Sequence, residues 1–176
     1  LYLVEADGQP VPVQSRSLAQ WPDGSVKWVL VSFVGQPGDY VLHIGQEARP
    51  QSQRRLVETL GGHRFRADTG RLLLTLDVSG PPEISEAFID GKAVDITGVD
   101  FSLTYSDGRR LSLADSLIED VRLLENGSER AVLWLRGRYM LNDTPDLEYT
   151  LQWRFYRDQP LVYVDATFTN RLGSKV

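Results

Sequence analysis

Residues 21–33 read WPDGSVKWVLVSF, which is a tight turn followed by an apolar segment. Pro22 fixes its own φ near about −65° and Gly24 accepts a positive φ, so Pro22-Asp23-Gly24 predicts a sharp reversal of the chain. From Val26 to Phe33, apolar side chains occur at both odd and even positions. A run that does not alternate is typical of a strand buried on both faces, as in a closed barrel or between two layers.

The same pattern, a short apolar segment followed by a turn, continues along the chain. Five Asp-Gly or Asn-Gly pairs favour tight hairpins, namely Asp7-Gly8, Asp23-Gly24, Asp90-Gly91, Asp107-Gly108 and Asn126-Gly127. The predicted strands are residues 1–5, 11–18, 26–33, 40–44, 56–60, 63–67, 71–78, 84–89, 101–105, 131–135, 147–156 and 161–169. Short strands at this spacing predict an antiparallel, all-β protein.

Residues 112–124 allow two interpretations. Leu113, Leu117, Val121 and Leu124 have the spacing of an amphipathic helix. However, Val121 and Leu123 alternate directly into Asn126-Gly127, a strong short-range hairpin signal. We therefore predict a strand here.

The composition changes between Gly45 and Arg55, where Gly, Pro, Gln, Ser and Arg replace large apolar residues. This change predicts a linker. We accordingly divide the chain into a small barrel-like unit at residues 1–50 and an antiparallel β-sandwich at residues 51–176. The chain opens on Leu1 and stops shortly after a predicted strand, so we expect it to be part of a longer protein.

Composition excludes several classes of function. The 176 residues are 41% hydrophobic and 24% charged, which is typical of a globular protein with a real core. A net charge of −5 argues against nucleic acid as the main partner. No apolar stretch approaches the ~20 residues of a membrane span, so we predict no membrane partner. The absence of cysteine excludes disulfides and thiolate chemistry.

No motif identifies a reaction. Both histidines, His43 and His63, lie in predicted strands, where such residues are usually packed or on the surface. The carboxylates of Asp143, Asp146 and Glu148 could bind a hard cation, but Asp residues in loops more often stabilise their own turns. We predict no metal and no cofactor.

Aromatic residues offer one candidate site. Exposed tryptophan rings stack on sugars, yet core packing is the expected role of Trp28, Trp134 and Trp153 in their apolar strands. Trp21 precedes the turn and is the tryptophan most expected to be exposed. Trp21 and Asp23 are therefore the candidate carbohydrate-binding residues.

Two motifs support a family resemblance. Residues 8–14, GQPVPVQ, and residues 21–28, WPDGSVKW, resemble the N-terminal RIFT-barrel domain of exo-rhamnogalacturonan lyase-like proteins. Later segments are similar to the central β-sandwich of that family. They are Asp68-Thr69-Gly70 with the leucine-rich strand after it, residues 126–132 and residues 164–170.

The resemblance implies a polysaccharide lyase setting, in which a general base abstracts the C5 proton of a uronic acid. In such proteins a large helical toroid follows the β domains and carries much of the catalytic cleft. No matched position offers a catalytic base, so we expect a non-catalytic β portion that scaffolds or shapes a sugar site. Its expected partners are an acidic, pectic-type polysaccharide and the remaining domains of the parent chain, in a secreted or periplasmic protein.

Two other functions stay open. One is a carbohydrate-binding module that uses Trp21 and nearby aromatic residues. The other is a structural or assembly β-domain without a ligand.

Overall fold

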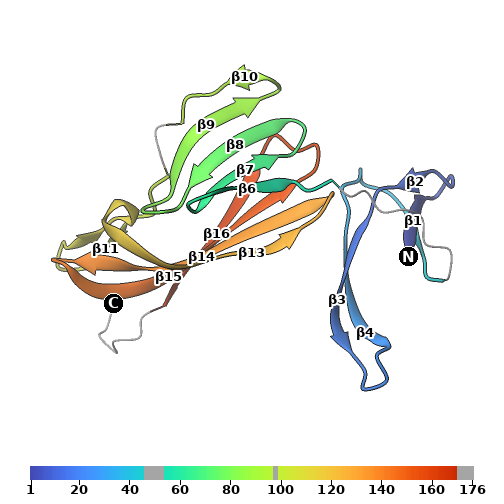
Figure 1. Ribbon diagram of the computed structural model, residues 1–176, viewed down its shortest axis with the longest axis horizontal. Helices are drawn as coiled ribbons and strands as arrows, with labels where there is room; N and C mark the ends of the chain where they lie inside the picture. The colour runs from blue at the N-terminus through green and yellow to red at the C-terminus, as the bar shows by residue number, and fades with distance from the viewer. Residues whose placement is uncertain (46–53, 97–98, 170–176) are drawn as a thin grey trace.

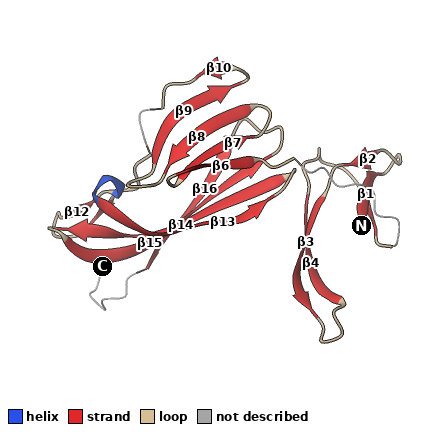
Figure 2. Ribbon diagram, viewed as in Figure 1, coloured by secondary structure: helices blue, strands red, loops and turns tan. Residues whose placement is uncertain are grey.

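The computed structural model describes residues 1–45, 54–96 and 99–169. Within these ranges the chain is built from antiparallel strands, and the single helical element is the short 3₁₀ turn η1 (Leu113–Asp115) (Figure 2). The all-β prediction is confirmed. No helix in the described ranges is long and apolar enough to cross a membrane.

The N-terminal strands form two small sheets. One has the order β2-β1-β5, with β1 (Tyr2–Glu5) between β2 (Pro10–Val11) and β5 (Tyr40–His43). The other is a hairpin of β3 (Gln14–Gln20) and β4 (Val26–Ser32). This β3–β4 hairpin projects away from the rest of the molecule (Figure 1).

Two larger sheets face each other as a sandwich (Figure 1). The five-stranded sheet has the order β10-β9-β8-β7-β6 and the four-stranded sheet the order β13-β14-β15-β16. The bounds are β6 (Val57–Gly61), β7 (Arg64–Asp68), β8 (Leu72–Asp77), β9 (Glu83–Ile89), β10 (Lys92–Ala93), β13 (Ser116–Asn126), β14 (Arg130–Leu141), β15 (Thr144–Tyr156) and β16 (Val162–Thr169). A small pair, β11 (Leu103–Thr104) and β12 (Arg110–Leu111), lies between them in the sequence.

Alternation on the long strands produces the core. Every second residue of β14 and β15 points between the sheets, where it meets the leucines of β8. The innermost side chains include Leu74, Leu76, Leu133, Leu135, Tyr149, Leu151, Trp153 and Phe155. The leucine-rich strand and the core position expected for Trp153 are therefore confirmed.

The ambiguous region of residues 112–124 is a strand for most of its length. The 3₁₀ turn η1 comes first, capped by the Ser112 side chain, and β13 runs from Ser116 to Asn126. The helical spacing of the leucines fails to specify a helix because β13 pairs with β14 from Ser116 to Asn126, with only two bulges in the ladder. Tertiary pairing overrides a weak local periodicity.

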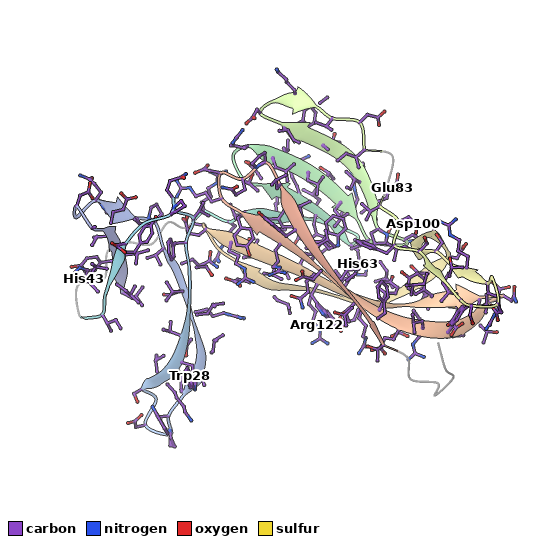
Figure 3. All side chains as sticks on the ribbon, turned by 180° about the vertical axis from the view of Figure 1, so that it is seen from behind. Trp28, His43, His63, Glu83, Asp100 and Arg122 are labelled. Carbon is purple, nitrogen blue, oxygen red and sulfur yellow. The ribbon has the colours of Figure 1, made fainter. Side chains whose placement is uncertain are left out.

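Two expectations about single residues, Trp28 and His63, and one about the strand β4 are wrong. Trp28 is 64% exposed, and Val26 and Val29 are exposed as well, so β4 is not buried on both faces in the described structure. His63 lies outside a strand, in the turn between β6 and β7, with a φ of 63°. His43, in contrast, lies in β5 and stacks on Tyr2 with ring centroids 4.5 Å apart (Figure 3).

The predicted linker falls mostly on residues 46–53, which lie outside the described residues. The domain boundary near residue 50 stays a prediction.

One side chain connects the N-terminal strands to the sandwich. Gln14, at the start of β3, accepts hydrogen bonds at Oε1 from the backbone N–H groups of Glu129 (3.1 Å) and Arg130 (3.0 Å). Its Nε2 donates to the buried carboxylate of Glu125 at 2.7 Å. The Gln14 side chain thus bonds to the β13–β14 turn and attaches the N-terminal strands to the sandwich.

Candidate functional site

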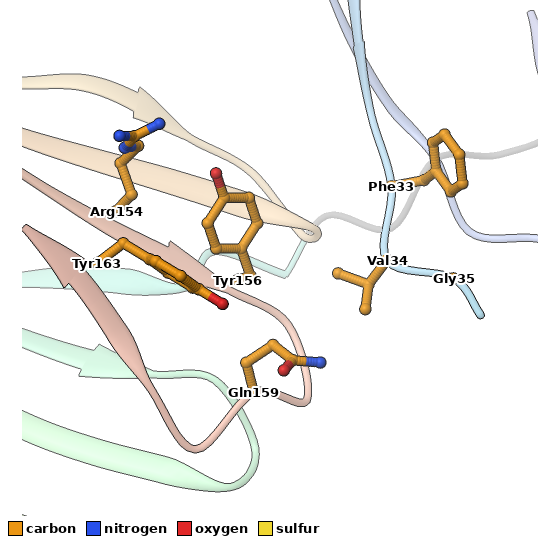
Figure 4. Close-up of a pocket in the computed structure, with 7 residues that line it drawn as sticks. All are labelled: Phe33, Val34, Gly35, Arg154, Tyr156, Gln159 and Tyr163. Carbon is orange, nitrogen blue, oxygen red and sulfur yellow. The ribbon is translucent and has the colours of Figure 1, made fainter. Parts of the chain in front are cut away.

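A pocket of about 440 Å³ lies where the chain leaving β4 passes the ends of β15 and β16. Its lining residues are Phe33, Val34, Gly35, Arg154, Tyr156, Gln159 and Tyr163. Figure 4 shows the Val34 side chain directed toward Tyr156 and Gln159, whereas the Phe33 ring points away. The pocket is thus formed by segments more than a hundred residues apart in the sequence.

Two tyrosines form the aromatic wall of the pocket. The rings of Tyr156 and Tyr163 meet edge to face, with centroids 5.7 Å apart and an interplanar angle of 88°. Tyr163 is 50% exposed, so part of its ring is open to solvent. An exposed ring braced by a second ring is a surface on which the apolar face of a sugar can stack.

Arg154 adds positive charge to this wall. It lies directly opposite Tyr163 in the β15–β16 ladder and pairs with Asp165 of β16. On the other side of Tyr156, the Arg130 guanidinium lies 5.9 Å from the ring centroid and pairs with Glu125 at 3.2 Å. The arginines are held by protein carboxylates, so a ligand carboxylate would share Arg154 with Asp165.

The other wall is fixed by a glycine. A side chain on Gly35 would collide with Tyr40, whose hydroxyl donates to the Gln36 carbonyl 2.5 Å away. Tyr40 also packs on Phe33, with ring centroids 5.0 Å apart. Residues 33–36 are therefore shaped by β5, the strand that follows them.

The base of the pocket is the turn between β15 and β16. Asp158 adopts a φ of 54°, and the Gln159 carbonyl accepts a 2.7 Å hydrogen bond from the buried Thr69 hydroxyl. Arg157 donates to the buried Glu129 carboxylate at 3.2 Å. The Thr69 and Glu129 side chains hold this turn at two points, so the backbone of Gln159 has a well-defined position.

Trp21 and Asp23 do not line this pocket. Both lie at the turn of the β3–β4 hairpin, where Trp21 is 51% exposed and Lys27 Nζ lies 4.3 Å from its ring centroid. Asp23 Oδ1 accepts from the Ser25 hydroxyl (2.6 Å) and the Ser25 N–H (2.9 Å), which lowers the pKa of Asp23. Asp23 is thus engaged in its own turn, and sugar binding by these two residues stays a prediction.

No set of three or more His, Asp or Glu side chains suited to a metal ion occurs in the part of the chain that the structure describes. Asn142 and Asp143 both have a positive φ, as a two-residue hairpin turn requires. Asp146 accepts a 3.1 Å hydrogen bond from the Tyr105 hydroxyl. Asn142 and Asp143 thus form the turn of their own hairpin, whereas Asp146, in β15, contacts the β11–β12 hairpin through Tyr105.

The N-terminal strands identify the kind of domain that begins the chain. Residues 1–42 match the PcRGLX-like N-terminal RIFT barrel domain. The predicted resemblance to rhamnogalacturonan lyase-like proteins is confirmed by this match. The matched segment of the RIFT barrel domain contains β1 to β4 and most of β5, so it includes the hairpin and ends seven residues after Gly35.

A curated relative extends the similarity to the sandwich. The protein called "Uncharacterized protein YetA" from Bacillus subtilis (strain 168) is 27% identical over 170 residues, which is 89% of this chain. The chain spans only 19% of that relative's length. No solved structure matches the chain.

Sequence reasoning missed the pocket residues. Tyr156 and Tyr163 fall in strands that were predicted, and the structure places them on the outer face of the sheet. No feature of the sequence around residues 33–35 indicates that this segment lies beside the outer face of β15 and β16. The sequence does not show which distant strands end next to β4.

Proposed function

We propose that this chain is a non-catalytic β portion of a polysaccharide lyase-like protein and that it helps to shape a sugar-binding site. The observation that carries the proposal is the pocket between the RIFT-barrel-like segment and the sandwich, with a half-exposed tyrosine and an arginine on one wall. Sugar sites in proteins combine such an aromatic platform with a few polar groups that fix orientation. Arg154 and the Gln159 amide are the groups suited to hydroxyl and carboxylate oxygens, which favours an acidic polysaccharide of the pectic type.

The chain on its own is expected to leave pectic polysaccharides intact. Elimination at a uronic acid needs a general base placed at the C5 proton, and the lining of this pocket contains no carboxylate, histidine or lysine, either to act as that base or to activate its two tyrosines. Incubation with homogalacturonan and rhamnogalacturonan, followed by the ultraviolet absorbance of unsaturated products, measures the activity. Robust turnover by this chain would contradict the non-catalytic assignment.

Replacing Tyr163 with alanine is expected to weaken retention on immobilised pectic polysaccharide by about tenfold, because a central aromatic contact is lost. Affinity electrophoresis measures the effect. Tyr163→Phe keeps the ring and should retain binding. Thr167→Ala, on the same exposed face of β16 but away from the pocket, is the matched control.

The same assay tests the carbohydrate-binding module as the second candidate, which the exposure of Trp21 favours. If Trp21→Ala abolishes retention with the melting temperature unchanged, the hairpin turn is the sugar site instead. Loss of retention with Tyr163→Ala and not with Trp21→Ala supports the pocket. Wild-type protein that is not retained at all would favour a structural domain without a ligand.

A further inference from the structure

The two walls of the pocket come from distant parts of the chain. Residues 33–35 form one wall, and the ends of β15 and β16 form the other (Figure 4). The first wall directly follows Ser32, the last residue of β4, and Ser32 lies opposite Gln14 in the β3–β4 ladder. Whatever holds Gln14 therefore also holds the start of this wall.

Gln14 is held by the β13–β14 turn of the sandwich. Its carboxamide bonds to the carboxylate of Glu125 and to the N–H groups of Glu129 and Arg130, at 2.7, 3.1 and 3.0 Å. Gly127 provides the space for this carboxamide, because a Cβ there would overlap it. We call these three hydrogen bonds the Gln14 clasp.

The residues of the clasp also support the aromatic wall. Arg130 pairs with Glu125 at 3.2 Å, and its guanidinium lies over the Tyr156 ring, 5.9 Å from the centroid. Tyr156 in turn meets Tyr163 edge to face. A continuous set of contacts thus connects Gln14 to the half-exposed tyrosine of the pocket.

A second set of contacts connects the clasp to the base of the pocket. Glu129 accepts hydrogen bonds from Arg157 at its backbone carbonyl (3.0 Å) and at its buried carboxylate (3.2 Å). Arg157 lies two residues before Gln159, which lines the pocket. Both walls and the base are therefore positioned from the turn that Gln14 occupies.

We propose that the Gln14 clasp regulates the pocket by setting the spacing of its two walls. With the clasp closed, residues 33–35 stand beside Tyr156 and Gln159. With the clasp released, water solvates its polar groups, residues 33–35 separate from the sandwich, and affinity for the sugar falls. The effect on affinity rests on the proposed sugar-binding function. Because such coupling is reciprocal, a bound sugar also keeps the clasp closed.

A distance measurement without ligand tests the spacing of the walls. The chain contains no cysteine, so cysteines introduced at Gln36 and Leu161, both exposed and next to opposite walls, carry a unique pair of spin labels. Double electron–electron resonance should give one narrow distance distribution, and adding Gln14→Leu should broaden it. Gln20→Leu, at an exposed position of the same strand, is the matched control and should leave it narrow. An equally narrow distribution with Gln14→Leu would overturn the proposal.

Retention on immobilised pectic polysaccharide tests the effect on binding. Gln14→Leu should weaken retention about fivefold or more, although Gln14 is not among the residues that line the pocket. Adding the polysaccharide to wild-type protein should slow amide exchange at Glu129 and Arg130. Full retention of Gln14→Leu would overturn the proposal and leave the proposed function intact. A wild-type chain that is not retained would contradict the proposed function, and the distance measurement then decides whether the clasp sets the spacing.

An exchange of partners tests the hydrogen bonds themselves. Gln14→Glu places a second carboxylate against Glu125 and should release the clasp as Gln14→Leu does. Combining Gln14→Glu with Glu125→Gln restores a donor and an acceptor between the two positions, so the narrow distribution and the retention should return. Circular dichroism of each variant checks that the sandwich remains folded. A folded double variant with a broad distribution would overturn the proposal.

Discussion

Replacing Gly137 with alanine is expected to lower the free energy of unfolding by about 3 kcal/mol. Gly137 lies in β14 on the core face, directly opposite Tyr149 of β15. A Cβ at this position would lie 2.5 Å from both the Leu117 carbonyl oxygen and the Tyr149 hydroxyl oxygen. Backbone atoms of β13 cannot move aside without breaking the ladder, so the sheet itself must distort.

The Tyr149 ring cannot easily rotate away either. Its hydroxyl lies 3.0 Å from the Ser116 hydroxyl, and its ring packs on Tyr139 with centroids 5.1 Å apart. Burial raises the pKa values of both tyrosines, which keeps their hydroxyls protonated to a higher pH than usual. Tyr139 in turn donates a 2.5 Å hydrogen bond to the Phe101 carbonyl.

Urea denaturation followed by circular dichroism measures the effect of Gly137→Ala. Gly80→Ala is the matched control, since a Cβ at Gly80 meets no atom within 4 Å and its φ is not in the left-handed region. The control should change stability by less than about 0.5 kcal/mol. Equal stability of the two variants would show that β14 tolerates a side chain at position 137.

Replacing Gln14 with leucine is expected to destabilise the junction between the N-terminal strands and the sandwich by about 2–3 kcal/mol. Leucine fills a similar volume but can neither accept from the N–H groups of Glu129 and Arg130 nor donate to Glu125. Unpaired buried groups lose their hydration without compensation. Amide hydrogen exchange at Glu129 and Arg130 should accelerate first.

The matched control is Gln20→Leu, at an exposed position of the same strand. It should leave exchange in the β13–β14 turn unchanged. Gly127→Ala offers an independent check, because its Cβ would overlap the carboxamide of Gln14. If Gln14→Leu leaves both exchange and stability unchanged, water replaces the glutamine and the attachment is weaker than the geometry indicates.

The local sequence predicted where the turns lie, but it did not always predict why a glycine is needed in them. Gly24, Gly91 and Gly108 have φ values of 85°, 75° and 87°, as their Asp-Gly pairs predict. Asn126-Gly127 also introduces a hairpin, yet Gly127 is not among the residues with a positive φ. Glycine is needed there because the Gln14 side chain, from a distant strand, occupies the space of a side chain.

Asn126 shows the same limit. Its side chain exchanges two hydrogen bonds with the backbone of Val57, accepting at 3.0 Å and donating at 2.7 Å. The sequence predicts a turn residue at this position. Only the tertiary structure shows that the Asn126 side chain also pairs with the backbone of Val57, the first residue of β6, as a neighbouring strand would.

The sequence by itself determined the all-β class, most strand positions, the core role of Trp153 and the resemblance of residues 1–42 to a RIFT barrel domain. These features depend on alternation and turn chemistry, which act over a few residues. The tertiary structure decided that Trp28 is exposed, that Gln14 holds the sandwich turn, and that Tyr163 faces residues 33–35 across a pocket. Those outcomes depend on which distant strands lie side by side, and an apolar segment has the same local pattern whether or not a partner covers it.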